Sequence, residues 1–353
     1  MTVQVEFPKA SSESYEILIE SGIIKKTGEI LKSLACLKSV RTFSIVSDEN
    51  VAPLYCGTVA DSLISAGFNV ALFEIPAGEK SKSAEQYFEL QNGLAENQIT
   101  RSDALIALGG GVVGDLTGFT AATYLRGLPF VQIPTTLLAM VDSSVGGKTG
   151  IDIPAGKNLV GAFKQPATVL CDPDTLKTLT PEIFSDGMAE VIKHGMIRSE
   201  KLLQILLEKP IHENLPEIIE ANVKIKRDVV QKDEFDTGER QLLNFGHTIG
   251  HAIEKLSNFE VSHGNAVAIG MSMVTRAAVK KCVCPQECQS TLEKLLEKFN
   301  LPCKANFTPE EIYTAALSDK KRTADTIIEV IPVALGNCEL RKIPISELIE
   351  WIE

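Results

Sequence analysis

The histidines of this chain cluster in a pattern that could bind a metal ion. Of the five histidines in 353 residues, three lie close together, at His247, His251 and His263. The spacing of the first two places them on the same face of a helix. Upstream, one predicted helical stripe carries a carboxylate, an amine and an imidazole: Glu190, Lys193 and His194. A lone histidine more often caps or packs, but a carboxylate and two imidazoles with an open fourth position form the usual catalytic zinc site.

A glycine-rich turn provides a second candidate site. The apolar run Ala104–Leu108 predicts a buried strand, which leads directly into Gly109–Asp115 and then a helical segment. In such an arrangement, free backbone amides and the helix dipole point at a bound anion. A tight turn without a ligand is the alternative interpretation. Because the next strand ends in Pro134 rather than an acid, a dinucleotide site here would differ from the Rossmann type.

Polar residues also follow two other predicted strands. Asp48 and Asn50 follow one strand, and Glu79 and Lys82 follow the next. In an open α/β sheet these strand ends share one edge, where ligands bind, so a carboxylate is available for a ribose. Taken singly, Asp48 and Glu79 would more often be helix caps or first-turn acids.

A long connection of glycine and small polar residues runs from Pro134 to Asn158 and includes Lys148 and Lys157. Within a compact chain such a segment is either disordered or functional, and its apolar flanks indicate that it is held in place. Its Gly-Gly-Lys-Thr sequence resembles the end of a P-loop, but Asp142 stands where that motif needs a glycine. The sequence therefore argues against an NTPase.

The two candidate sites are most informative together. A metal site without the glycine turn would indicate a hydrolase, and the turn without a metal would indicate a simple nucleotide binder. Both in one chain indicate oxidation of an alcohol with the help of a Lewis acid.

The elements that position these residues fall into two predicted domains. The first half alternates β-branched runs with helical stretches, and the second half is almost entirely helical in period. We predict an α/β domain over residues 1–176, with a mostly parallel sheet and a non-standard dinucleotide-binding fold, and an all-α domain over residues 177–353. The predicted strands of the first domain are an opening hairpin, Val3–Phe7 and Tyr15–Glu20, and then Thr42–Ser47, Asn69–Ile75, Ala104–Leu108, Phe130–Ile133 and Thr168–Asp172. The predicted helices are Ser83–Asn97 in the first domain and, in the second, Ile183–Ile197, Lys201–Glu208, Leu215–Val230, Gly246–Leu256, Gly264–Lys281, Gln286–Phe299, Pro309–Leu317 and Ile345–Ile352, with a short strand at Thr326–Pro332.

Composition restricts the class of protein. The net charge of −11 argues against a nucleic-acid-binding surface, and no apolar run is long enough to span a membrane. The sequence starts without a signal-peptide pattern, so its eight cysteines predict reduced thiols in the cytosol rather than disulfides. Cys282, Cys284 and Cys288 lack paired C-x-x-C spacing, which favours free thiols over a metal site.

A series of motifs resembles one family, the 3-dehydroquinate synthases. In chain order the motifs are Gly109–Asp115, Tyr124–Gly127, Pro134–Thr136, Asp142–Gly150, Lys157–Phe163, Ala189–Lys193, Leu243–His251 and His263–Gly264. The resemblance spans roughly residues 40 to 335, and so many linked motifs make chance agreement negligible.

The resemblance implies roles for individual residues. A divalent metal ion, zinc or cobalt, would be held by Glu190, His247 and His263. NAD would be bound by Asp48, Asn50, Glu79, Lys82, Gly110, Gly111, Asp115, Thr135, Thr136, Lys148, Lys157 and Thr178. Catalytic roles would belong to Lys148, Lys193, Lys226, Arg240, Asn244 and His251, and further substrate contacts to Arg126, Asp142, Asn158 and a lysine at position 320 or 321, with Lys321 preferred. The family is typically a homodimer in which the arginine matching Arg126 reaches the neighbour's phosphate pocket.

The implied substrate is 3-deoxy-D-arabino-heptulosonate 7-phosphate, which would become 3-dehydroquinate and phosphate in the shikimate pathway of aromatic amino acid biosynthesis. The implied reaction proceeds in five steps: transient oxidation by NAD, phosphate elimination, re-reduction, ring opening and an internal aldol closure. Local lysines and arginines would hold this anion in spite of the negative net charge. The alternatives are another sugar-phosphate cyclase, a metal-dependent polyol dehydrogenase, and a non-enzymatic NAD sensor.

Overall fold

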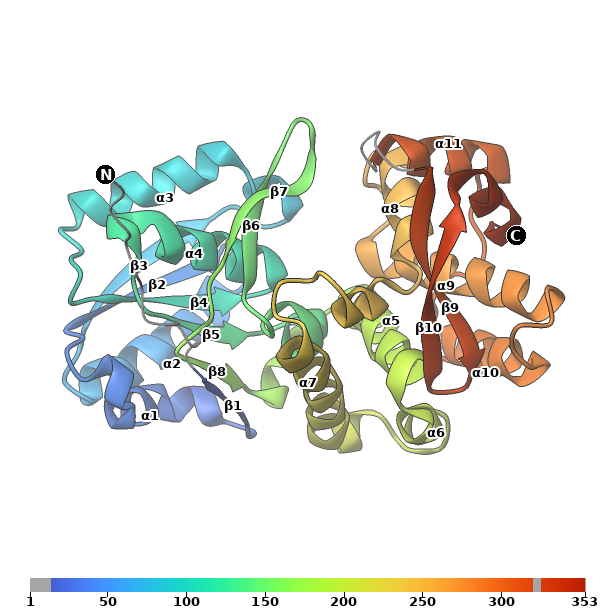
Figure 1. Ribbon diagram of the computed structural model, residues 1–353. Helices are drawn as coiled ribbons and strands as arrows, with labels where there is room; N and C mark the ends of the chain where they lie inside the picture. Colours follow the sequence, from blue (N-terminus) through green and yellow to red (C-terminus); the bar gives the residue numbers. More distant parts are fainter. Residues whose placement is uncertain (1–13, 320–324, 353) are drawn as a thin grey trace, which may run out of the picture.

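The computed structural model describes residues 14–319 and 325–352. A six-stranded sheet forms the core of the N-terminal half (Figure 1), and its spatial order is β1-β8-β5-β4-β2-β3. Every neighbouring pair in it is parallel. The strands are β1 (Glu16–Ile19), β2 (Thr42–Asp48), β3 (Asn69–Ile75), β4 (Ala104–Gly109), β5 (Phe130–Pro134) and β8 (Thr168–Cys171).

Helices cover both faces of this sheet, as a parallel sheet requires. The four covering helices are α1 (Thr27–Ser33), α2 (Ala52–Ser65), α3 (Ala84–Glu96) and α4 (Gly111–Thr123). Successive residues of β4 point to opposite faces: Ile106 packs in the cluster that contains Leu31 of α1 and Val59 of α2. Leu105 packs in the cluster that contains Leu90 of α3 and Val113 of α4. Because all of β4 is buried, its sequence is apolar throughout rather than alternating.

An antiparallel hairpin, β6 (Lys148–Ile153) and β7 (Gly156–Phe163), projects from this half toward the helical half (Figure 1). Gly150 and Gly161 face each other in its register. A Cβ added to Gly161 would lie 2.2 Å from the carbonyl oxygen of Thr149, so the two strands approach too closely for a larger residue. The long polar connection predicted from the sequence therefore contains an ordered hairpin, which we did not predict.

The C-terminal half is built mainly of helices around one large apolar cluster. They are α5 (Pro181–Arg198), α6 (Glu200–Glu208), α7 (Leu215–Lys232), α8 (His247–Leu256), α9 (His263–Lys280), α10 (Gln286–Lys298) and α11 (Pro309–Asp319). Helix α5 begins at a Pro, and the side chain of Thr180 caps it by accepting from the amide of Ile183 at 3.4 Å. All residues of α5 from 187 to 197 are buried, so this helix runs through the core.

One antiparallel strand pair and several short helices complete the fold. Strands β9 (Thr326–Ala334) and β10 (Asn337–Pro344) pair in the helical half. The 3₁₀ helices are η1 (Ile23–Lys26), η2 (Ala35–Leu37), η3 (Glu79–Ser81), η4 (Tyr124–Arg126), η6 (Pro173–Thr178), η7 (His212–Asn214), η8 (Glu239–Asn244) and η9 (Ile345–Trp351), and η5 (Ala139–Ser143) is a π-helical turn.

The predicted fold class is confirmed, and most predicted elements lie within two or three residues of their observed bounds. Besides the β6–β7 hairpin, further details differ or stay untested. The predicted strand Val3–Phe7 lies outside the described residues, and its predicted partner β1 pairs in parallel with β8. Strand β10 was not predicted, and the terminal helix is the 3₁₀ helix η9. The chain changes from α/β to helical between β8 and α5, and the domain boundary near residue 176 stays a prediction.

All eight cysteines are free thiols. Cys36 and Cys282 are exposed, whereas Cys284, Cys288 and Cys338 are buried together in the helical half. Burial raises the pKa of Cys288 to about 12. Among the described residues, the groups of potential metal ligands consist of histidines and carboxylates. None of the described helices combines the length and apolar character needed to cross a bilayer.

Candidate active site

Three helices bring Glu190, His247 and His263 together. Glu190 lies in the buried middle of α5, His247 is the first residue of α8, and His263 is the first residue of α9. Each histidine places Nε2 3.7 Å from Oε1 of Glu190. One ligand atom from each of the three residues lies within 4.8 Å of the other two. The sequence analysis predicted this same set as the metal ligands, and the structure brings it together.

The residues of this cluster fit a divalent cation. Both carboxylate oxygens of Glu190 are fully buried and accept no hydrogen bond, although one of them contacts the ammonium group of Lys193. Because Lys193 pairs with Oε2, Oε1 is the oxygen that remains for a metal ion, and both histidines face it. One carboxylate and two imidazoles, with room for a further ligand, match the donor set of catalytic zinc sites.

The second ring nitrogen of each histidine is held by an acceptor. Nδ1 of His247 lies 3.1 Å from the carbonyl oxygen of Phe245, and Nδ1 of His263 lies 3.5 Å from Oε2 of Glu254. An acceptor at Nδ1 holds the proton there, which leaves Nε2 as the ligating atom. Burial lowers the pKa of His247 well below its usual value, and the nearby Lys193 lowers it further. His247 is therefore neutral at physiological pH, as a metal ligand must be.

His251 lies one turn beyond His247 on α8 and is exposed. The ring centroids of these two histidines are 5.4 Å apart. His251 also belongs to a second possible ligand group, with Glu254 and His263, so geometry alone leaves both histidines of the helix beside the cluster. A third possible group joins Asp142, Glu190 and His194.

Buried cations lie next to the metal-ligand cluster. Lys193 is 1% exposed and Lys226 is 6% exposed. The ammonium group of Lys226, on α7, lies 2.5 Å from Oδ1 of Asp142 on η5. Burial raises the pKa of Asp142, but the attraction of Lys226 and Lys193 outweighs it and holds that pKa well below the usual value. Burial lowers the pKa of His194 to about 3, and its Nε2 lies 3.8 Å from Asp142.

The remaining predicted catalytic residues lie around this group in different ways. The buried Arg240 donates to the carbonyl oxygens of Gly146, at 3.0 Å, and Glu234, at 2.5 Å. Lys148, at the start of β6, is exposed and forms an ion pair with Asp236. Asn244, which ends η8, is exposed immediately before the metal-ligand helix.

The strand order of the sheet marks a second site at its carboxyl edge. From β2 the chain passes to β3 on one side and then to β4 on the other, and ligands bind at such a switch point. Ser47, near the end of β2, donates a hydrogen bond of 2.7 Å to the carbonyl oxygen of Leu108 on β4. The end of β4 enters the glycine turn, and α4 begins at Gly111. A Cβ on Gly110 would lie 3.1 Å from Cγ2 of Thr136, so the turn runs close to the end of β5.

Polar residues gather along this edge as predicted. The ammonium group of Lys82 lies 2.5 Å from Oδ2 of Asp115 on α4 and also contacts the side chain of Asn158. Burial and the charge of Asp115 act in opposite directions on Lys82, and its pKa is raised. Lys157 lies 3.4 Å from Oε1 of Glu79. Asn158, predicted to contact the substrate, is thus adjacent to the predicted cofactor residues.

Other predicted cofactor residues form hydrogen bonds with nearby parts of the chain or have a polar atom without a hydrogen-bond partner. Oδ1 of Asp48 accepts from the amides of Asn50 and Val51 at 2.9 and 3.0 Å and so holds the turn after β2, whereas the N-cap residue of α2 is Val51. The hydroxyl group of Thr135, at the end of β5, is buried without a hydrogen-bond partner. Thr178 on η6 forms a hydrogen bond of 2.8 Å with Tyr55.

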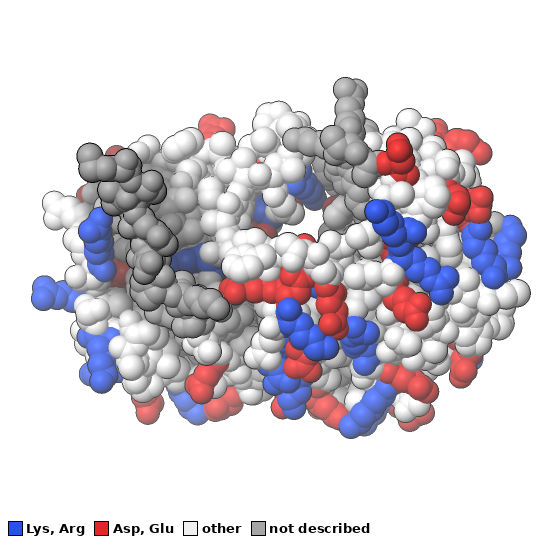
Figure 2. Space-filling model, viewed as in Figure 1, with Lys and Arg blue, Asp and Glu red and all other residues white. Residues whose placement is uncertain are grey.

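The two sites are connected across the two halves of the chain. Lys157, on β7, lies 3.1 Å from Oε1 of Glu254 on α8, and Oε2 of the same carboxylate faces His263. A continuous series of contacts therefore links the sheet edge to the metal-ligand cluster. Figure 2 shows a hollow between the two halves with basic side chains at its edge.

Arg126 is not part of this group, and one predicted site residue cannot be placed. Lys321, like Lys320, lies outside the described residues. Arg126, at the end of η4, is exposed. Arg126 has a φ of 69°, and the preceding Leu125 has a φ of 50°, so two non-glycine residues in sequence adopt the left-handed conformation.

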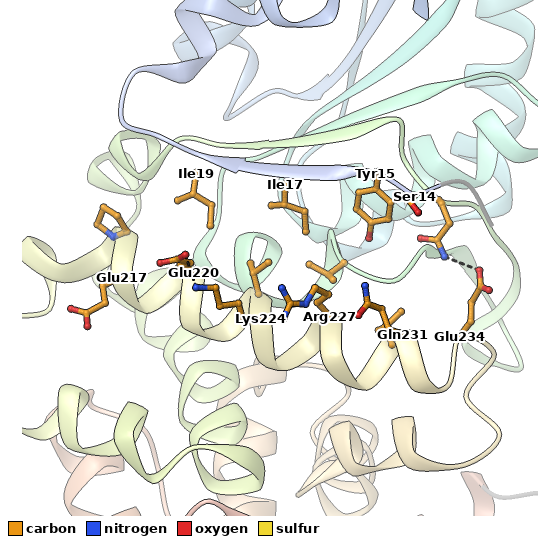
Figure 3. A pocket seen from close by; sticks show the side chains of 15 residues that line it. Ser14, Tyr15, Ile17, Ile19, Glu217, Glu220, Lys224, Arg227, Gln231 and Glu234 are labelled. Atoms are coloured by element: carbon orange, nitrogen blue, oxygen red, sulfur yellow. Dashed lines mark hydrogen bonds and ion pairs between the residues drawn. The ribbon is translucent and has the colours of Figure 1, made fainter. Parts of the chain in front are cut away.

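A groove of about 820 Å³ lies elsewhere, between β1 and α7 (Figure 3). Ile17 and Ile19 of β1 and Lys224 and Arg227 of α7 are among the residues that line it. None of the predicted site residues in the described part of the chain lines this groove. The titratable cluster, and not this groove, therefore marks the candidate active site.

Comparison with known proteins shows the family of this chain. The family model described as 3-dehydroquinate synthase N-terminal matches residues 72–186, and the model described as 3-dehydroquinate synthase C-terminal matches residues 187–322. The 3-dehydroquinate synthase of Streptococcus suis is 45% identical over 346 residues, which cover 96% of this chain and 97% of that protein. The chain belongs to the 3-dehydroquinate synthase family. A second member, from Enterococcus faecalis, is 44% identical over 343 residues, or 96% of this chain and 95% of that protein.

A solved structure extends the likeness in fold beyond this family. The 2-epi-5-epi-valiolone synthase of Streptomyces hygroscopicus, solved with NAD⁺ and Zn²⁺ bound, superposes with a TM-score of 0.84 at 24% identity and covers 98% of this chain and 97% of its own. At this identity the likeness concerns the fold. The fold of this chain is thus shared with a synthase whose name gives a different product.

Glu254 is the residue at this site that sequence reasoning missed. A single glutamate on a helix is usually exposed, and the resemblance assigned it no role. Its spacing was the available signal, because His247, His251 and Glu254 recur at i, i+4 and i+7 and so share one helix face.

Proposed function

We propose that this chain catalyses the 3-dehydroquinate synthase reaction, in which 3-deoxy-D-arabino-heptulosonate 7-phosphate yields 3-dehydroquinate and phosphate. The observation that carries the proposal is the cluster of Glu190, His247 and His263 beside the buried Lys193 and Lys226, in a member of this family. When bound, a divalent ion such as zinc or cobalt would supply a Lewis acid, and NAD would supply a temporary acceptor for two electrons.

The two cofactors have separate candidate positions. We propose that Glu190, His247 and His263 hold the metal ion, because their ligand atoms converge and Oε1 of the buried Glu190 faces both histidines. NAD would lie along the carboxyl edge of the sheet, at the switch point between β2 and β4. There the glycine turn would meet its diphosphate, and Asp48 or Glu79 would meet a ribose.

The cationic residues suit a doubly anionic substrate. Lys193, Lys226 and Arg240 would bind and orient its carboxylate and phosphate, and burial strengthens each such contact because water screens it less. Asp142 balances Lys226 until the substrate arrives. Asn244 and His251 are exposed beside the cluster, where each can hold a hydroxyl group or a proton of the substrate. The closing aldol step would need mainly orientation and exclusion of water.

One assay separates this function from its alternatives. The purified protein is given NAD, a divalent metal and the heptulosonate phosphate, and both phosphate release and net NADH are followed. Phosphate without net NADH is the expected result. Accumulation of NADH would indicate a polyol dehydrogenase. If neither phosphate nor NADH forms, the protein would be an NAD sensor. A different sugar phosphate as the preferred substrate would indicate another cyclase.

We also propose that the protein works in the cytosol as a homodimer in which Arg126 serves the neighbouring active site. Eight free thiols are typical of a reducing compartment. The exposed Arg126, held in an uncommon backbone conformation, is suited to a contact outside its own chain.

A further inference from the structure

Glu254 contacts both candidate sites at once. Its side chain is 4% exposed on α8. Oε2 lies 3.5 Å from Nδ1 of His263, a proposed metal ligand, and Oε1 lies 3.1 Å from the ammonium group of Lys157, a proposed NAD contact. Because the two partners use different oxygens, they do not compete for the carboxylate.

The contact with His263 bears on the metal ion. A carboxylate that accepts from the distal ring nitrogen of a metal-ligating histidine fixes the tautomer and orientation of the ring, and its removal typically weakens metal binding. The other proposed histidine ligand, His247, has only the neutral carbonyl group of Phe245 in this position. Glu254 is therefore the one anionic support of a ligating ring among the described contacts.

The contact with Lys157 bears on the dinucleotide. Lys157 lies near the start of β7 and also faces Glu79 at 3.4 Å and the ring of Phe259 at 4.7 Å. Glu79 follows β3 at the ligand-binding edge of the sheet. The position of the Lys157 ammonium group is thus set jointly by the sheet edge and by the helix that carries the metal ligands.

We propose that Glu254 is a positioning residue that couples the metal site to the NAD site, an inference that rests on the proposed function. A metal ion on Nε2 of His263 makes the Nδ1 proton more acidic and strengthens its hydrogen bond to Glu254. The carboxylate is then fixed where Lys157 meets it, so Lys157 is already in place for NAD. Bound NAD, by holding Lys157, orients Glu254 toward His263 in return, because coupling between two sites is reciprocal.

The test is a binding cycle with the full-length protein. Zinc affinity is measured by competition with a chelator, with and without saturating NAD, and NAD affinity is measured with and without zinc. In the unaltered protein each ligand should tighten the other by about five-fold or more. Glu254→Gln should weaken zinc binding about 10- to 100-fold and abolish the mutual effect.

Two further variants make the outcome specific. Glu260→Gln removes the same charge from an exposed position near the end of α8 and should leave both affinities and their coupling unchanged. Lys157→Met should keep most of the zinc affinity measured without NAD but lose the gain that NAD gives. Circular dichroism of every variant establishes that it is folded, and Glu254→Asp replaces Glu254→Gln if the latter is not.

Two results would overturn the proposal: zinc affinity of Glu254→Gln within about two-fold of the unaltered protein, or coupling that survives in that variant. Phosphate release by the unaltered protein tests the proposed reaction separately. A chain that binds zinc and NAD with coupling but releases no phosphate would contradict the reaction and support the role of Glu254.

Discussion

Glu190 and Lys193 are fully buried charged residues on a helix whose middle section is surrounded by apolar side chains. Charged side chains are almost never fully buried unless they are paired, and replacing them with apolar residues would often stabilise a fold. Their burial in contact with each other, beside two imidazoles, is thus better explained by ligand binding than by stability.

Glu190→Gln should abolish metal binding without unfolding the protein. The amide has nearly the same shape as the carboxylate, so the packing around the middle of α5 is kept. Elemental analysis should find about one zinc-like ion per chain in the unaltered protein and almost none in the variant. The variant's melting temperature without metal should be lower than that of the metal-free parent, because the buried Lys193 loses its partner carboxylate. Full metal content in Glu190→Gln would remove this residue from the ligand set.

His247→Ala and His251→Ala should separate the two histidines of α8. Nε2 of His247 faces Glu190, and its Nδ1 is already held by a carbonyl group, so its loss should remove the metal and the activity together. His251 is exposed, and a fourth protein ligand would tend to close the position that the substrate needs. His251→Ala should therefore keep its metal and NAD binding but lose most of its turnover. A metal-free His251→Ala protein would show that the alternative group with Glu254 is the real site.

The sequence alone predicts much at this scale, but not the contacts between distant residues. The clustering of His247, His251 and His263 was sufficient to suggest a metal, and the family resemblance selected His247 and His263 as ligands. The position of Glu254 between His263 and Lys157 depends on how α8 packs against the β6–β7 hairpin. Such a contact between distant segments cannot be read from a single sequence.

Among the secondary-structure elements, α8 and α9 must pack closely for their first residues to share a metal. A Cβ added to Gly270 of α9 would lie 2.0 Å from the carbonyl oxygen of Gly246, which precedes α8. The added Cβ is fixed to the backbone of α9, and the oxygen belongs to the backbone before α8. Neither atom can turn aside, so the helices would have to move apart.

Gly270→Ala should therefore lower both stability and metal affinity. Overpacking of a tight contact costs about 1–3 kcal/mol, and separation of the helices moves His247 away from His263. Denaturant unfolding and chelator competition measure the two effects. Ser272→Ala is the control on the same helix, because it removes a buried hydroxyl group that has no hydrogen-bond partner and should change little. Wild-type metal affinity in Gly270→Ala would mean that the spacing of the helices does not matter.

The strands differed from one another in how well the sequence predicted them. Strands β2, β4 and β5 are largely buried apolar or β-branched runs, β3 is a partly exposed edge strand, and the predicted bounds of all four nearly equal the observed ones. The β6–β7 hairpin was missed because its close approach requires Gly150 and Gly161, and glycine lowers strand propensity. Strand β10 was missed because its exposed residues give no clear apolar alternation.

At the scale of the whole molecule, the position of Arg126 predicts shared active sites. If Arg126 completes the neighbour's phosphate pocket, Arg126→Ala and Lys226→Met chains should each be inactive alone. Co-expressed, they form mixed dimers in which one of the two sites contains both intact residues. Activity should then recover to about a quarter of the wild-type value, as random pairing of the two chains predicts. No recovery, with mixed dimers demonstrated, would mean that Arg126 acts within its own chain.

The reaction rates of the exposed and buried thiols can be used to measure how often the folded protein opens. Exposed Cys36 and Cys282 should react with a chromogenic disulfide reagent within seconds to minutes, whereas Cys284, Cys288 and Cys338 become reactive only when the helical core opens. Burial raises the pKa of all three buried thiols, which slows their chemistry further. Cys56 and Cys171 are buried in the sheet half, so they are first replaced by alanine; the slow phase of labelling then reports opening of the half that carries the proposed metal ligands. A bound metal ion should lengthen it without altering the fast phase.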